Sequence, residues 1–347
     1  MTLSSSNGPL PTVNKLGNTI TTFNGNGATI NGQNGVNGLW IFSGTVGVND
    51  LHFKNCYSKG GDGGFPSGGA AGGIGGGLII GGTVGGSPDT ANVTLSNVTF
   101  DGCQAIGGDG ADGSTTEDIG GGGGGGLFQS DGHPGSTLAP NFNGGNGGGP
   151  FGGSGGFAGP GGDVINLGTG SGGGGGGGAK GFSGGNSDEM GSLGGGSGAG
   201  DPPGEPSIYA AGGGGELKGG GSGSPGNNSL YGGSGRGADA ISGGGGGGGG
   251  ALGGSIFIAN SGNLVINDGF SSTNTNIVAG KGGLGGNDIP FDGKARGFDV
   301  FSLSTTPLII DSSEEVSMGT SILLGEDGLP AGINGGDHQK GHWNSRS

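Results

Sequence analysis

The sequence predicts an all-β protein: a parallel β-helix, in which short strands stack into a solenoid, combined with a long glycine-rich segment. Short runs of alternating apolar residues, typical of strands, occur in both halves of the 347-residue chain. These runs repeat as a unit, and no window shows the i, i+3, i+4, i+7 apolar spacing of an amphipathic helix. Glycine occupies 108 positions and costs about 1 kcal/mol relative to alanine inside a helix, so we expect almost no helix.

The expected strands are short apolar runs bounded by Gly, Ser, Asn or Asp. Because side chains alternate across a strand, Val93, Leu95 and Val98 share one inward row if that strand contains a small kink. The expected strands are 39–42, 45–53, 78–80, 92–100, 255–259, 263–267, 298–303, 307–311 and 321–324.

Four stretches share one skeleton: a short apolar strand, a Gly/Ser turn, a second alternating strand and often a polar exit. A unit of roughly 20 residues is too small to bury its apolar face alone, so it has to stack on its neighbours. In a parallel β-helix, equivalent residues of successive coils then lie about 4.8 Å apart. The four units are 38–56, 77–103, 254–269 and 297–313.

The two cysteines mark the same repeat. Cys56 and Cys103 lie 47 residues apart in similar phrases, HFKNCYSKGGDGG and TFDGCQAIGGDG. We expect the two thiols to lie one above the other at one corner of adjacent coils. A disulfide or a metal pair is one interpretation. We favour a ladder of small buried thiols, because free Cys is among the most buried residue types and two thiols do not complete a metal site. Upstream, the apolar residues expected to face each other are Val46, Val48, Leu51 and Phe53, opposite Val93, Leu95, Val98 and Phe100.

Two glycine-rich stretches interrupt the repeat. The shorter, 59–77, has the composition of an excursion from a corner of the solenoid. The longer, 107–254, is compatible with flexible coil, the usual fate of Gly/Ser-rich sequence, or with a bundle of extended threefold helices of polyproline-II type. We favour the bundle, in which glycine lets neighbouring backbones hydrogen-bond. Apolar residues would then mark the side facing the β-helix: Phe151, Phe157, Val164, Ile165 and Leu167.

Charge and hydropathy exclude several partner classes. The net charge of −15 repels phosphate backbones, and nucleic-acid affinity depends on Lys and Arg, so we expect no nucleic-acid partner. No run approaches the roughly 20 apolar residues that cross a bilayer, so we expect no membrane insertion. The first residues lack the basic start and apolar core of a signal peptide, which leaves the export route undefined.

We predict no catalytic, cofactor-binding or metal site and no cofactor. GGDGAD (107–112) fits the start of a calcium-binding nonapeptide, with Asp109 and Asp112 as ligands, but such sites need tandem copies and only one is present. Asp50 and Asp268 close similar strands, which indicates a corner preference more than an acid–base pair.

The histidines form no group with these acids. His52 lies between two inward residues and is expected on a solvated face, while His338 and His342 belong to a polar tail and His133 to the glycine-rich segment. The acidic pair Glu314 and Glu315 is expected to face solvent.

The order of phrases resembles the glycine-rich β-helix passenger domains of bacterial autotransporter-like surface proteins. The resemblance rests on NGNGATI, GLWIFSGTVGVNDLHF, NVTLSNVTF, a long glycine tract and GGSIFIANSGNLVIND, and it covers most of the chain in order. It implies a secreted or surface-displayed right-handed β-helix that serves adhesion or matrix, with no catalytic residues. Neither an export signal nor a membrane-anchoring barrel is recognised here, which departs from the family.

We therefore expect a structural, non-enzymatic protein, extracellular or at the cell surface, forming a fibre, matrix element or adhesin. Its expected partners are further copies of itself, added head to tail, and surface glycans or other matrix components. The alternatives are a phage tail receptor-binding tip protein and a β-helix polysaccharide-degrading enzyme. The expected regions are N-terminal β-helix coils (1–106), the glycine-rich segment (107–254), C-terminal coils (255–330) and a polar tail (331–347).

Overall fold

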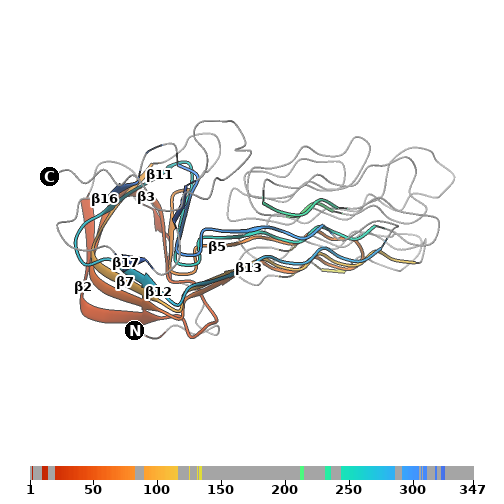
Figure 1. Ribbon diagram of the computed structural model, residues 1–347, viewed down its shortest axis with the longest axis horizontal. Coiled ribbons are helices and arrows are strands. Elements are labelled where there is room, and N and C mark those ends of the chain that lie inside the picture. Colours follow the sequence, from red (N-terminus) through yellow and green to blue (C-terminus); the bar gives the residue numbers. More distant parts are fainter. Residues whose placement is uncertain are drawn as a thin grey trace.

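The regular elements of the molecule are all β-strands (Figure 1). The computed structural model describes residues 2, 10–14, 20–82, 90–115, 125, 131, 133–134, 212–214, 231–235, 244–285, 291–304, 306, 308–310, 317–318 and 322–324. Within these residues there is no helix, and every strand pair is parallel. The predicted all-β class with parallel sheets is confirmed for this part of the chain.

The strands range from two to 16 residues. They are β1 (Val13–Asn14), β2 (Ile20–Asn31), β3 (Leu39–Lys54), β4 (Tyr57–Lys59), β5 (Gly73–Ile74), β6 (Leu78–Ile80), β7 (Ala91–Asp101), β8 (Gln104–Ile106), β9 (Ala251–Leu252), β10 (Ile256–Ile258), β11 (Gly262–Ile266), β12 (Ser271–Thr273), β13 (Asn276–Val278), β14 (Ala295–Arg296), β15 (Val300–Ser302), β16 (Ile309–Ile310), β17 (Ser317–Met318) and β18 (Ile322–Leu324).

One long sheet dominates the fold and curls into a half-barrel (Figure 1). Its main path runs β16-β11-β7-β3-β6-β10-β15-β18. The curl follows from β3, whose first residues pair with β6 and whose later residues pair with β7. Between the two parts, Gly44 has a φ of 101°, a conformation that residues with a Cβ rarely adopt, and the strand turns there.

Two three-stranded sheets lie where the chain leaves and re-enters the long sheet. We call β13-β8-β4 the exit sheet and β14-β9-β5 the return sheet. The chain repeatedly passes from the return sheet through the long sheet to the exit sheet, then makes a glycine-rich excursion and comes back. Such passes, stacked in parallel, are compatible with a β-solenoid.

The predicted register between the first two cysteine-containing units is confirmed. Val46 pairs with Val93 and Phe53 with Phe100, with the expected offset of 47 residues throughout. At the next pass Ala91 pairs with Gly262, an offset of 171, because the longer glycine-rich segment intervenes. The runs at 39–42, 78–80, 255–259, 298–303 and 321–324 contribute adjacent strands of the long sheet, as their common position in the repeat predicts.

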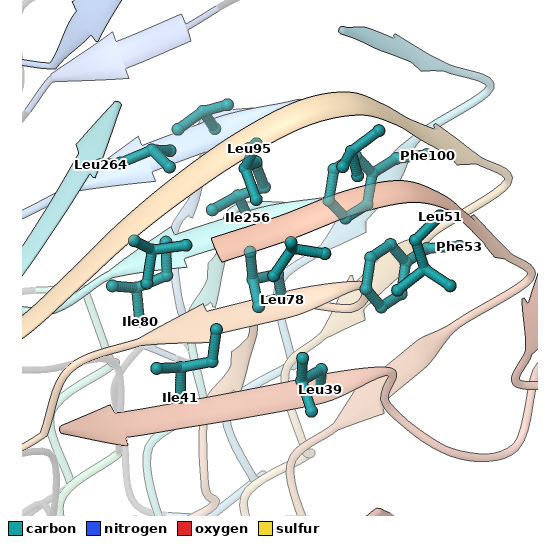
Figure 2. Packing of buried hydrophobic residues seen from close by; sticks show 14 of the residues in the cluster. Leu39, Ile41, Leu51, Phe53, Leu78, Ile80, Leu95, Phe100, Ile256 and Leu264 are labelled. Atoms are coloured by element: carbon teal, nitrogen blue, oxygen red, sulfur yellow. The ribbon is translucent and has the colours of Figure 1, made fainter. Parts of the chain in front are cut away.

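The apolar core lies on the concave side of the long sheet (Figure 2). Inward residues of successive passes stack in rows. The rings of Phe53 and Phe100 lie 4.9 Å apart and nearly parallel, at 5°. Both side chains are fully buried. Burying one such side chain contributes about 1.5–3 kcal/mol, so these rows are a main source of stability.

The expected kink between Leu95 and Val98 is present. Asn97 has a φ of 52°, and its partner in the previous pass, Asp50, has a φ of 51°. The Asn97 side chain donates a 2.6 Å hydrogen bond to Asp50 Oδ1, and the Asn97 N–H donates to the Asp268 carbonyl oxygen. Asp50 therefore lies at a kink within β3, and Asp268 lies in the bend between β11 and β12.

A second apolar layer covers the outer face of the short strands of the long sheet. Trp40, Ile79, Phe257 and Phe301 form one outward row, and Tyr231 packs on it with its ring 5.2 Å from that of Phe301, edge to face. Tyr231 comes from the glycine-rich segment. The segment is therefore anchored to the sheet by an aromatic contact.

Candidate functional site

The most distinctive feature is a set of extended glycine-rich segments that run side by side away from the exit and return sheets (Figure 1). We call it the glycine bundle. Its described segments are 60–72, 107–113, 212–214, 231–235, 244–250, 279–285 and 291–294. It draws on three excursions of the chain, so it includes the predicted excursion at 59–77 and a third, at 279–294, that the sequence analysis did not identify.

The segment 244–250, made entirely of buried glycines, lies at the centre of the bundle. Its N–H groups point to three different neighbours in turn. Gly246 and Gly249 donate to Ala111 and Gly108, both in 107–113. Gly247 donates to the segment 212–214 and Gly248 to 291–294, at 2.8 and 3.1 Å. A period of three in donor direction is the mark of a threefold extended helix, since a β-strand alternates between two directions.

The carbonyl groups of the same segment serve three further neighbours. Gly246 and Gly249 accept from the segment 279–285, and Gly247 and Gly250 accept from Ala70 and Gly73. Gly248 accepts from Gly233. The central segment is thus hydrogen-bonded to six surrounding segments, and the N–H and C=O groups of residues 246–249 are all paired with other backbone groups.

Glycine is required by the closeness of these backbones. A Cβ atom added to Gly246, Gly247 or Gly248 would lie less than 3.0 Å from a carbonyl oxygen of another segment. These oxygens belong to Gly68, Gly233 and Gly280, respectively. Three consecutive residues therefore face three different backbones at contact distance. This explains why the tract tolerates no side chains.

The segments run in two directions. Gly107, Gly110 and Gly113 donate to Val278, Lys281 and Leu284, so the outgoing segments are parallel. Gly249 and Gly246 donate to Gly108 and Ala111 in the reverse order, so the returning segments are antiparallel to the outgoing ones. The bundle therefore grows out of the exit sheet and returns into the return sheet.

Aspartates complete the hydrogen bonding at one edge of the bundle. Asp109 accepts from the Lys281 N–H at 2.7 Å, and Asp112 accepts from the Leu284 N–H at 2.6 Å. Asp62 accepts from the Asp109 N–H in the same way. These carboxylates accept hydrogen bonds from backbone N–H groups, as the carbonyl groups of a neighbouring strand do elsewhere in the bundle. Asp109 and Asp112, the two candidate calcium ligands of GGDGAD, thus bond to backbone N–H groups, and among the described residues no group of three or more metal-ligating side chains is found.

Asp62 also carries the principal ion pair of this edge. Its carboxylate lies 3.1 Å from Lys59 Nζ. Partial burial acts to lower the pKa of Lys59, but the hydrogen bond and the charges of Asp62 and Asp131 outweigh it, so that pKa lies above its ordinary 10.5. The ammonium is therefore held in its charged form.

A buried polar network appears in the pass 256–278, where earlier passes are apolar. Ser272 takes the place of Phe100, and its hydroxyl donates to Asp299 Oδ1 at 2.8 Å. Thr275 donates to the same oxygen at 2.9 Å, and the side chain of Asp299 is fully buried. Sequence reasoning missed this network because Ser, Thr and Asp at these positions look like turn residues.

The remaining expected residues are placed as follows. His52 is half-buried on the outer face, with Nδ1 2.6 Å from Thr99 Oγ1 of the next pass, and His133 is exposed. Phe151, Phe157, Val164, Ile165, Leu167, Glu314, Glu315, His338 and His342 lie outside the described residues. The anchor that the structure does describe, Tyr231, was not predicted, although an aromatic residue directly before a glycine pair in the glycine-rich segment was a usable signal.

Comparison with known proteins gives no family for this chain. No family model matches the sequence, and neither curated proteins nor solved structures contain a significant match. Among the described residues, no helix has the length and hydropathy to cross a membrane.

Proposed function

We propose that the chain is a structural protein of the cell surface or extracellular space, serving as a fibre, matrix element or adhesin. In this proposal the stacked passes close into a right-handed parallel β-helix, and the glycine bundle adopts polyglycine-II-type packing. The bundle is the projecting part, and the β-helix is the base that fixes its direction.

The observation that carries the proposal is the six-neighbour hydrogen bonding of 244–250. A segment bonded on all sides bends only if several neighbours move together, so the bundle is expected to be stiff. Backbone hydrogen bonds contribute about 0.5–1.5 kcal/mol each and require no apolar surface, so they stabilise a narrow rod that lacks a conventional core. Stiff narrow projections suit proteins that span distances or present a surface.

Self-association follows from the edge of the long sheet. Among the described residues, β2 pairs with β3 on one side, and its other edge carries a single bridge, from Asn31 to Thr2. Strand edges of this kind recruit other strands. Head-to-tail addition of copies at residues 20–28 gives an open filament, because a heterologous contact does not close.

A second candidate function is receptor binding by the end of the bundle. Phe65, Leu284 and Phe291 are 46%, 63% and 47% exposed. Phe65 lies in the turn of the first excursion, and Leu284 and Phe291 belong to the two described segments of the third. Exposed apolar side chains on a projecting bundle suit a phage tail receptor-binding tip protein.

Electron microscopy of the purified chain over a concentration series tests the first proposal. We expect thin filaments that lengthen with concentration. The variant Ile20→Lys places a charge on the β2 edge, at a residue 72% exposed, and is expected to shorten them. Leu284→Lys, an equally polar change on the bundle, is the matched control and should leave the filaments intact. A wild-type chain that stays monomeric at every concentration contradicts the filament, and a loss of filaments in the Leu284 variant alone moves the contact to the bundle.

A further inference from the structure

Cys56 and Cys103 occupy equivalent positions of two adjacent passes. On one side Lys54 pairs with Asp101, and on the other Tyr57 pairs with Gln104. The Gln104 N–H donates a 2.8 Å hydrogen bond to the Cys56 carbonyl oxygen. This register puts the two Cα atoms about one strand spacing, ~4.8 Å, apart. Disulfides span Cα separations of about 4.4–6.8 Å, so the backbone spacing suits a cross-link without rearrangement.

Both thiols face the same interior. They are free, fully buried and part of the main apolar core. Cys56 Sγ lies 3.8 Å from the Ile30 carbonyl oxygen, and Cys103 Sγ lies 3.9 Å from that of Phe53. In the following pass Thr275 takes this position. Thr273 pairs with Asp101 before it, and Asn276 pairs with Gln104 after it. The thiol stack is therefore confined to two passes.

We propose that Cys56 and Cys103 form a cross-linking site, at which an intrachain disulfide fastens the pass 39–59 to the pass 91–106. The oxidant is a small-molecule disulfide such as oxidised glutathione. One cysteine, as its thiolate, attacks the glutathione disulfide and releases one glutathione thiolate. The other then attacks the mixed disulfide and releases the second. The protein thus loses two protons and two electrons, and glutathione disulfide is reduced to two glutathione thiols.

The step occurs as the two passes assemble, or when this corner opens. Hydrogen bonding to Cys56 and burial raise the pKa of the Cys103 thiol, so the folded chain holds little of the reactive thiolate. Once formed, the bond fixes the register of β3 on β7. A slip of one residue would otherwise carry every inward side chain to the outer face. This inference is independent of the proposed surface role.

The test is the disulfide equilibrium of the full chain in a fixed buffer of reduced and oxidised glutathione. The chain is equilibrated under native conditions, entered by refolding from either the reduced or the oxidised form, and in parallel in concentrated guanidinium chloride. Acid quenching, alkylation with N-ethylmaleimide and intact mass then count free thiols, glutathione adducts and the cross-linked chain, which is two hydrogen atoms lighter. Cys56→Ser and Cys103→Ser serve as controls, each able to take one glutathione but unable to close.

By linkage, a fold that holds the thiols in place favours the cross-link by the same factor as the cross-link favours the fold. For a 47-residue loop that factor is roughly 10³, so the native equilibrium constant should exceed the denatured one by about that much. A ratio near or below unity overturns the proposal. Accumulation of glutathione adducts or of disulfide-linked dimers in the native arm overturns it as well.

Discussion

Replacing Gly247 by alanine perturbs the centre of the glycine bundle by a single methyl group. The added Cβ would meet the carbonyl oxygen of Gly233 and the backbone of Ser234. Both are backbone atoms, so no side chain can rotate away. The segment 231–235 would have to move, and the hydrogen bonds from Gly233 to Gly248 and from Gly213 to Gly233 would lengthen.

The expected cost combines three effects. Overpacking of a close contact costs roughly 1–3 kcal/mol. Two weakened backbone hydrogen bonds cost about 0.5–1.5 kcal/mol each. Against this, alanine reduces the backbone entropy of the unfolded chain, which stabilises by roughly 0.4–1 kcal/mol. The balance is a loss on the order of 3 kcal/mol, which is a large part of the stability of an ordinary domain.

Chemical denaturation and amide exchange of Gly247→Ala measure this cost. Gly47→Ala is the matched control, because a Cβ there meets only the side chain of Thr22 at an ordinary 3.6 Å. We expect the control to be as stable as the wild type or slightly more so. We expect the Gly247 variant to lose stability, and to lose amide protection at Gly233 and Gly213, the donors of the two weakened bonds. An unchanged Gly247 variant would refute close backbone packing in the bundle.

Three further predictions concern the core, the bundle edge and an ion pair. Phe100→Ala should cost about 3–5 kcal/mol in the free energy of unfolding, because a fully buried ring stacked on Phe53 is removed; a loss below 1 kcal/mol would contradict that packing. Asp109→Ala should speed amide exchange at Lys281, whose N–H loses its acceptor, whereas Asp109→Asn keeps an acceptor oxygen and should exchange like the wild type; equal rates in all three chains would remove the edge role of this residue. Because the pKa of Lys59 is raised in the folded chain, its ion pair contributes its full stability below pH 10.5 and loses it as the pH rises through the folded pKa. The difference in unfolding free energy between wild type and Lys59→Met should therefore shrink only at strongly alkaline pH. A difference already lost at neutral pH would contradict this prediction.

The strands of the long sheet were largely predictable, because the residue pattern that indicates each strand lies within the strand itself. Alternating apolar residues identified β7 and the later part of β3, and the repeated phrase around the cysteines set their register. The 12-residue strand β2 was missed, since its inward residues are few and its glycines and asparagines resemble a loop.

For the described glycine segments, extended hydrogen-bonded structure was predictable, but the partners of each segment were not. Glycine carries no side chain that distinguishes one neighbour from another, so nothing local indicates that Gly247 bonds to 212–214 while Gly248 bonds to 291–294. The excursion at 279–294 is short and holds few consecutive glycines, so it did not stand out. The carboxylates of Asp109 and Asp112 could accept a hydrogen bond from a backbone N–H or bind a cation. The sequence of 107–112 does not distinguish these roles, because the N–H groups that they bind belong to the neighbouring segment 279–285.

Scalar couplings across hydrogen bonds, measured by NMR on the isotope-labelled chain, test most directly whether the glycine segments pack as a threefold bundle. They connect the amide nitrogen of each donor with the carbonyl carbon of its acceptor. The account predicts that Gly246, Gly247 and Gly248 couple to Ala111, Gly213 and Phe291, three residues of three different segments. Couplings from all three to a single neighbouring strand, or rapid amide exchange with no coupling, would contradict it.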